Sequence, residues 1–164
     1  MCVVALAGLG CSVAGTESAT PTEQEPALVE IWLSPDHVAY EAQSAWGLPL
    51  PCDLEVVDVP LADLQSMFGG PSEGQRWGHT PYDGCEIFVA QELFAPEQDS
   101  IREMVMSHEL GHRLEYARGV RGHLEVDKGC PLNGPGKHLM CAGGSEALSP
   151  YPDSDDYSLL LGER

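Results

Sequence analysis

Basic residues are scarce in this sequence: 8 Lys and Arg stand against 26 Asp and Glu, which gives a net charge of −18. Proteins that bind nucleic acid need positive charge over the phosphates, and proteins that dock to anionic lipid need it for the same reason. The composition therefore argues against both kinds of binding. The excess of acidic residues fits a solvated surface and also a preference for basic substrates, and it does not decide between them.

Long hydrophobic runs are missing as well, and no stretch is long and apolar enough to cross a bilayer. Residues 2–10 are small and apolar and lead directly to Cys11, with no basic residue ahead of them. This segment resembles the end of a bacterial secretion signal that stops at a lipid-acceptor cysteine. We therefore expect residues 1–11 to be a signal and lipobox-like segment of an exported protein. That protein would be a cell-envelope lipoprotein anchored through Cys11, or freely secreted; a short intracellular N-terminus is the alternative.

The chain of 164 residues suits one domain, and hydrophobic residues make up 43% of it, which is enough for a core. Residues 12–26 are rich in Ser, Thr, Glu and Pro and predict a flexible linker. We expect a single folded domain over residues 27–164, and we expect it to be a monomer.

The cysteines fit an exported protein. Assigning Cys2 and Cys11 to the signal leaves four others, and in an oxidising compartment four cysteines indicate two disulfides. Of the three possible pairings we favour the two that close modest local loops, Cys52–Cys85 and Cys130–Cys141. Four free buried thiols are the alternative.

The pattern of apolar residues predicts a mixed α+β fold. Strands are expected at residues 27–33, 53–59 and 85–90, and helices at residues 36–46, 100–118 and 152–161. Residues 66–84 and 119–136 are rich in Gly and Pro and are expected to be loops. The helix at 100–118 is the strongest, with Ser100 and Glu103 placed as a capping box and Gly119 placed to end it. Its apolar residues cover more than one face, so we expect it to be buried.

The most informative stretch is SHELGH, residues 107–112, in the middle of that helix. His108 and His112 are four residues apart, so both imidazoles lie on one helix face. Two such imidazoles can bind one Zn²⁺, and Glu109 can take a proton from a water on the metal. Two His and one Glu inside a buried helix would be costly without a function. The pattern predicts a catalytic zinc site with Glu109 as general base.

Zinc needs a third protein ligand. Glu115 lies about 10 Å along the helix axis from His108 and cannot converge with both histidines on one ion. A returning segment must supply the ligand, and His123 is the best candidate because a glycine-rich turn brings it back after the helix ends. The rivals are the acidic residues Glu125 and Asp127 in the same loop, and a more distant residue. We expect ordinary surface or loop roles for His37, His79 and His138.

With these residues in place, the chain resembles the metzincins, a clan of zinc endopeptidases, and in particular the matrixin-like members. The clan carries HExxHxxGxxH, then a tight turn with a methionine beneath the metal (the Met-turn), then a C-terminal helix. The matching segments are His108-Glu109-Leu110-Gly111-His112, Gly119, His123, His138-Leu139-Met140-Cys141, Leu148-Ser149-Pro150 and Asp155-Asp156. His112 and His123 are eleven residues apart rather than the family's six, which a helix one turn longer would accommodate. The resemblance covers about residues 85–161, roughly half of the chain.

The resemblance implies a zincin-like fold, with a mixed β-sheet packed on a buried active-site helix, a Met-turn and a C-terminal helix. Met140 would be an apolar floor under the metal rather than a ligand. Residues 142–150 would line a substrate pocket, and the strand at residues 85–90 would be the sheet edge that pairs with an extended substrate. The acidic residues near the last helix could bind Ca²⁺, although a solvated helix start is the better explanation for them: Asp153, Asp155 and Asp156.

These observations predict an exported zinc endopeptidase that acts on protein or peptide substrates. His108, His112 and His123 would hold Zn²⁺, and Glu109 would act as general base and then return the proton to the leaving amine. One alternative is a non-catalytic, zinc-stabilised binding module on the cell surface. Another is a gluzincin-type peptidase with an acidic third ligand.

Overall fold

A computed structural model describes residues 34–69, 75–124, 130, 138–141 and 150–162. The predicted signal, linker and first strand lie outside the described residues. So do the two rival zinc ligands Glu125 and Asp127, and most of the predicted substrate-pocket segment.

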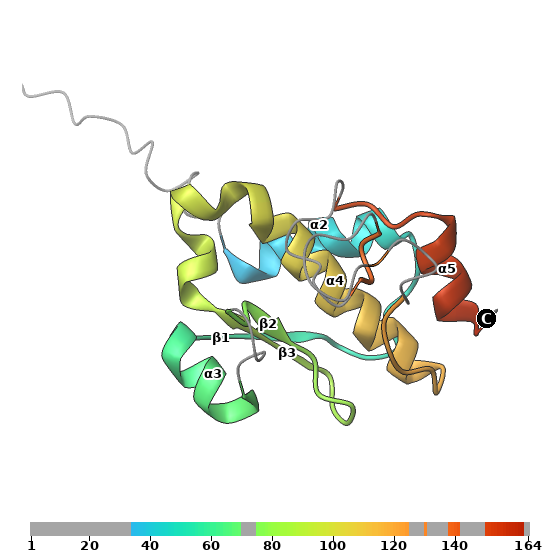
Figure 1. Cartoon of the computed structure of the whole chain (residues 1–164), viewed down its shortest axis with the longest axis horizontal. Coiled ribbons are helices and arrows are strands. Elements are labelled where there is room, and N and C mark those ends of the chain that lie inside the picture. Colours follow the sequence, from blue (N-terminus) through green and yellow to red (C-terminus); the bar gives the residue numbers. More distant parts are fainter. Residues whose placement is uncertain (1–33, 70–74, 125–129, 131–137, 142–149, 163–164) are drawn as a thin grey trace, which may run out of the picture.

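The described residues form a mixed α+β fold, as the sequence predicts (Figure 1). In chain order the elements are α2 (Pro35–Trp46), β1 (Glu55–Val59), α3 (Leu61–Phe68), β2 (Gly78–His79), β3 (Glu86–Ala90), the 3₁₀ turns η1 (Gln91–Phe94) and η2 (Pro96–Gln98), α4 (Asp99–Ala117) and α5 (Ser154–Leu161). The strands form one sheet in the order β1-β3-β2, parallel between β1 and β3 and antiparallel between β3 and β2.

Helix α4 is the centre of the fold. It crosses the molecule in Figure 1 and packs against α2, α5 and the strands β2 and β3. Met106, Leu110 and Leu114 on this helix are completely buried, so it supplies much of the core. The prediction of a buried central helix is confirmed. Gly119, with φ 72°, follows the helix in the left-handed conformation expected of a glycine that ends it.

The start of α4 differs from the prediction. The helix begins at Asp99, with Gln98 in the N-cap position and no side-chain capping hydrogen bond, so the predicted capping box does not form. The reason is local: η2 leads directly into the helix, and Asp99 already has helical dihedral angles. A 3₁₀ turn that runs into a helix removes the extended residue that a capping box needs.

Two predictions for the sheet region are wrong. The expected loop at residues 66–84 contains the end of α3 and all of β2, because Leu64 and Phe68 have helical spacing and β2 is too short to show a strand pattern. The strand predicted as the sheet edge, β3, lies between β1 and β2. Strand β3 pairs with a neighbour on each side, and its residues Ile87 and Val89 are fully buried. Among the described strands, the edge beside α4 belongs to β2.

Both predicted disulfides are present. Cys52–Cys85 joins the segment before β1 to the start of β3, and Cys130–Cys141 joins two segments beside the histidines. Two disulfides fit an oxidising, extracellular environment. Within the residues that the structure describes, no helix is both long and apolar enough to span a bilayer.

Candidate metal centre

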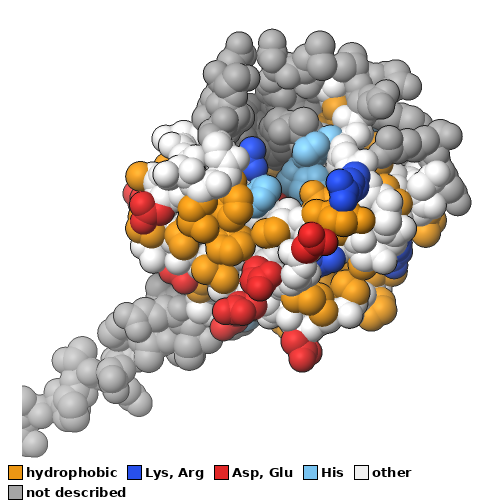
Figure 2. Space-filling model, turned by 90° about the horizontal axis from the view of Figure 1, so that it is seen from below, with side chains coloured by type: hydrophobic (Ala, Val, Ile, Leu, Met, Phe, Trp, Pro, Cys, Tyr) orange, Lys and Arg blue, Asp and Glu red, His pale blue; other side chains and the backbone are white. Residues whose placement is uncertain are grey.

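Three histidine side chains converge beside the middle of the buried helix α4. The Nε2 atoms of His108 and His112 are 3.1 Å apart, those of His112 and His123 3.0 Å, and those of His123 and His108 3.3 Å. Figure 2 shows histidine side chains gathered together on one face, with basic side chains beside them. The structure thus brings together the three residues that the sequence predicts, although His123 is eleven positions beyond His112.

The spacing of the three nitrogens fits one metal ion. Tetrahedral zinc with Zn–N distances of about 2.0–2.1 Å holds its nitrogen ligands about 3.4 Å apart, close to the separations here. Without a cation between them, three imidazole lone pairs at this distance would repel one another. The three histidines could therefore hold a metal, and among the described residues no fourth protein ligand joins this group.

The outer nitrogens of the two helical histidines are held in place. His108 Nδ1 donates to the carbonyl of Leu139 at 2.6 Å, and His112 Nδ1 donates to Glu115 Oε2 at 2.8 Å. Both acceptors fix the proton on Nδ1 and leave the Nε2 lone pair facing the centre, as in metal sites with ordered outer partners. Glu115, which the sequence analysis set aside as a ligand, is fully buried and orients His112 instead.

Burial lowers the pKa of two histidines in the cluster. It lowers the pKa of His112 to about 3, with a further contribution from His108, and it lowers the pKa of His123 to about 3, helped by both other histidines and by Arg76. Both imidazoles are therefore uncharged near pH 7, which is the form that binds metals.

Glu109 is held beside this cluster by the edge strand. Thr80 Oγ1, 2.8 Å from both Glu109 Oε2 and the Glu109 carbonyl oxygen, donates to the glutamate, which is 7% exposed. Gly78 packs so tightly on the Glu109 side chain that a Cβ there would lie 2.7 Å from Glu109 Cγ. No sequence pattern pointed to Thr80 or Gly78, because they meet Glu109 only through the pairing of β2 with β3.

Met140 lies under the helix, as the sequence analysis expected of an apolar floor. It is fully buried, and a Cβ on Gly111 would collide with its sulfur and with the Trp46 ring. Trp46 Nε1 donates to the carbonyl of Ser107 at 2.8 Å and so ties α2 to the same stretch of α4. A residue larger than glycine at position 111 would separate these groups.

A buried carboxylate anchors the turn that carries Met140 (residues 138–141). Asp156 accepts hydrogen bonds from the backbone amides of Leu139, Met140 and Asp153, and burial raises its pKa. Asp156 also completes a capping box with Asp153 at the start of α5. This aspartate therefore has a structural role, joining the turn to the last helix.

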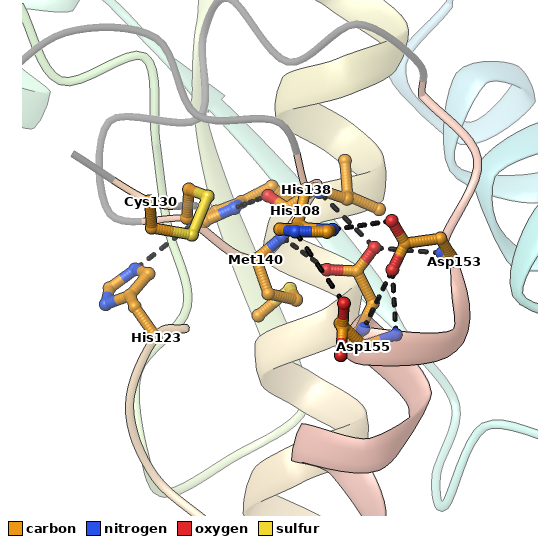
Figure 3. The surroundings of a disulfide bond; sticks show 10 residues. His108, His123, Cys130, His138, Met140, Asp153 and Asp155 are labelled. Atoms are coloured by element: carbon orange, nitrogen blue, oxygen red, sulfur yellow. Dashed lines mark hydrogen bonds and ion pairs between the residues drawn. A yellow bond between two sulfur atoms is a disulfide. The ribbon is translucent and has the colours of Figure 1, made fainter. Parts of the chain in front are cut away.

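The segment that carries His123 is tied to the same turn. Leu124 donates its amide to the carbonyl of Met140 at 3.0 Å and forms a parallel bridge with Cys141. Cys141 is in turn linked to Cys130, and Figure 3 shows this disulfide beside Met140 and His123. The backbone next to His123 is thus fixed to the turn under the metal centre.

The other histidines differ from one another. His37 lies on α2 near Glu41 and has the surface role expected of it. His79 packs on the Phe68 ring and accepts a hydrogen bond from Arg76. His138 forms a second group that could hold a metal, with Asp153 at 2.6 Å and Asp155 at 3.8 Å, as Figure 3 shows.

The sequence analysis gave His138 no role and grouped the aspartates as a possible Ca²⁺ site. In the structure the three aspartates have different partners. Asp156 accepts hydrogen bonds from backbone amides, whereas Asp153 and Asp155 lie beside the imidazole of His138. Calcium prefers roughly six to eight oxygen ligands, so a group with one imidazole and two carboxylates suits it poorly.

Comparison of the chain with protein-family models, with curated proteins and with solved structures found no match.

Proposed function

We propose that this protein is a zinc-dependent endopeptidase of the metzincin type. The observation that carries the proposal is the convergence of three imidazoles at 3.0–3.3 Å beside a buried glutamate held by Thr80. A purely structural zinc site takes four protein ligands, whereas a catalytic one leaves a position for water or substrate. The described group offers three ligands, which supports the catalytic kind of site.

His108, His112 and His123 would hold the zinc through Nε2. When bound there, zinc supplies a Lewis acid that polarises the scissile carbonyl and lowers the pKa of a water molecule. Nitrogen ligands from imidazole suit Zn²⁺ and make Ca²⁺ or Mg²⁺ poor candidates. A gluzincin-type site with an acidic third ligand would have no need for His123 beside the other two histidines.

Glu109 acts as the general base in this mechanism. Thr80 occupies Oε2 and fixes the side-chain rotamer, so Oε1 accepts the proton of the attacking water. The carboxyl group then returns that proton to the nitrogen of the leaving amine as the peptide bond breaks. Thr80 and Gly78 act as positioning residues, because they hold Glu109 from the side of β2.

The substrate would bind along β2 rather than along β3, since β3 is enclosed by its neighbours in the sheet. An extended peptide can add to a free strand edge through backbone hydrogen bonds, which suits an enzyme that cuts unfolded chains. The two disulfides support an exported protein, and the N-terminal segment fits a lipoprotein or a secreted protein.

The proposal is tested by cleavage of an unfolded protein such as casein. Zinc-loaded full-length chain should cleave it, lose activity with a chelator and regain it with added zinc. Glu109→Ala should bind zinc and lose activity by at least about a hundredfold, whereas Glu103→Ala, at an exposed position of the same helix, should behave like the wild type. Zinc binding without cleavage by the wild type would favour the non-catalytic binding module.

A further inference from the structure

Arg76 and Arg113 are the two described arginines whose buried Nε has no hydrogen-bond partner, and Arg76 is the one that comes just before β2. Arg102 forms an ion pair with Asp99, and Arg118 donates to the carbonyl of Leu114. Arg76 donates from Nη1 to His79 Nδ1 at 2.9 Å, and its Nε is buried without a partner. Within the part of the chain that the structure describes, no carboxylate pairs with its guanidinium.

The position of Arg76 is next to the metal centre. It comes two residues before Gly78, which touches Glu109, and four before Thr80, which bonds to Glu109. In Figure 2 basic side chains border the histidines on this face.

We propose that Arg76 binds a carboxylate of the substrate, so that the enzyme prefers peptides with Asp or Glu close to the scissile bond. This inference rests on the proposed peptidase function. A guanidinium presents a rigid fork of donors that matches a carboxylate, and a half-buried arginine without an internal partner can use it on a ligand.

The proposal predicts a preference for acidic substrates, whereas the net charge alone predicts a preference for basic ones. A chain with a net charge of −18 repels acidic peptides at long range and would suggest basic substrates. Salt screens that repulsion beyond about 8 Å at physiological ionic strength, whereas a contact between Arg76 and a carboxylate is screened much less. Acidic peptides should therefore gain relative to neutral peptides as salt is raised.

The first experiment identifies cleavage sites. The zinc-loaded full-length protein is incubated with a library of peptides derived from a whole proteome, and the new termini are mapped by mass spectrometry. We expect Asp and Glu to be enriched within a few positions of the cut bond. Parallel libraries with free and amidated C-termini separate the two sources of a carboxylate. Enrichment that follows the free C-terminus would assign the arginine to the chain end and overturn the side-chain proposal.

The second experiment assigns the preference to Arg76. A fluorogenic peptide with Glu at the enriched position is compared with its Gln counterpart, and the ratio of the two kcat/KM values is measured. Arg76→Gln should reduce this ratio by about tenfold to a hundredfold, the range for a charge-assisted hydrogen bond. In Arg76→Glu the preference should change sign, so that a peptide with Lys at that position is cleaved with a higher kcat/KM than the peptide with Glu. Arg118→Gln removes an arginine at the far end of α4 and should keep the wild-type ratio.

Zinc stoichiometry of each variant separates misfolding from a change of specificity. Cleavage by the wild type without acidic enrichment, or a ratio that is unchanged in zinc-loaded Arg76→Gln, would overturn the proposal for Arg76 and leave the peptidase intact. Zinc binding with no cleavage of any library would instead overturn the proposed function, and the substrate preference with it.

Discussion

The two halves of the histidine cluster are built in different ways. His108 and His112 stand on one continuous helix, where a four-residue spacing alone brings their rings together. His123 comes from a segment outside helices and strands, held by the backbone bond from Leu124 to Met140 and by the neighbouring Cys130–Cys141 disulfide. Local geometry thus positions the first half of the site, whereas tertiary ties position the second.

The largest effect is expected when one zinc ligand is removed from either half of the cluster. His112→Ala and His123→Ala should both abolish stoichiometric zinc binding at micromolar zinc, because loss of an outer partner alone costs about tenfold to a hundredfold in affinity. Isothermal titration with zinc measures this for each variant. A His123→Ala protein with full affinity would show that another residue completes the site, and would favour the acidic third ligand.

The two disulfides offer a matched pair, one close to the histidines and one away from them. Removing both cysteines of a pair should cost about 3.7 kcal/mol for Cys52–Cys85, which spans 33 residues, and about 2.8 kcal/mol for Cys130–Cys141, which spans 11. The variant without Cys130–Cys141 should lose less stability but more zinc affinity than the other, because only this disulfide braces the segment of His123. Denaturant unfolding and zinc titration of the two double serine variants check this. Equal affinities would mean that His123 needs no such tie.

Two neighbouring aspartates test the anchoring of the turn beneath the cluster. Asp156→Ala leaves three backbone amides without their acceptor and should lower the free energy of unfolding by about 3 kcal/mol. Asp155→Ala removes a partly exposed carboxylate and should cost about 1 kcal/mol or less. Thermal or urea unfolding distinguishes them. Similar losses at the two positions would contradict the anchoring role of Asp156.

The smallest expected effect lies within the helical half. Glu115→Gln keeps the shape of the side chain but removes the charge that faces His112 Nδ1, and it should weaken zinc binding by about tenfold. Glu103→Gln, at an exposed position on the same helix, should leave the affinity unchanged. An affinity that is the same in both variants would mean that Glu115 serves packing alone.

The same division explains what the sequence could predict. The central helix, predicted at residues 100–118 and found at 99–117, follows from local spacing, as do its glycine end and the pair His108 and His112. Loop lengths were sufficient to favour the correct disulfide pairings. His123 could be proposed only as a residue of a returning loop, and its place beside the other histidines depends on contacts far along the chain.

What the sequence analysis missed depends on pairing between distant segments. Thr80 and Gly78 reach Glu109 because a two-residue strand joins β3, and so short a strand leaves no recognisable pattern. The central place of β3 follows from which neighbours pair with it, and the apolar run from Ile87 to Ala90 fits an edge or a central strand. The sequence analysis considered Glu115 only as a metal ligand. Its spacing of i to i+3 from His112 already allowed a hydrogen bond to the imidazole nitrogen that faces away from the metal.

The central claim is that His108, His112 and His123 together bind one catalytic zinc. X-ray absorption at the zinc edge of the zinc-loaded full-length protein tests it most directly, because the scattering counts the imidazoles around the metal. We expect three imidazole nitrogens at about 2.0–2.1 Å and one oxygen from water, with one imidazole fewer in any His123→Ala protein that can be loaded at high zinc. A spectrum of the wild type with two imidazoles, or with four protein ligands, would contradict the account.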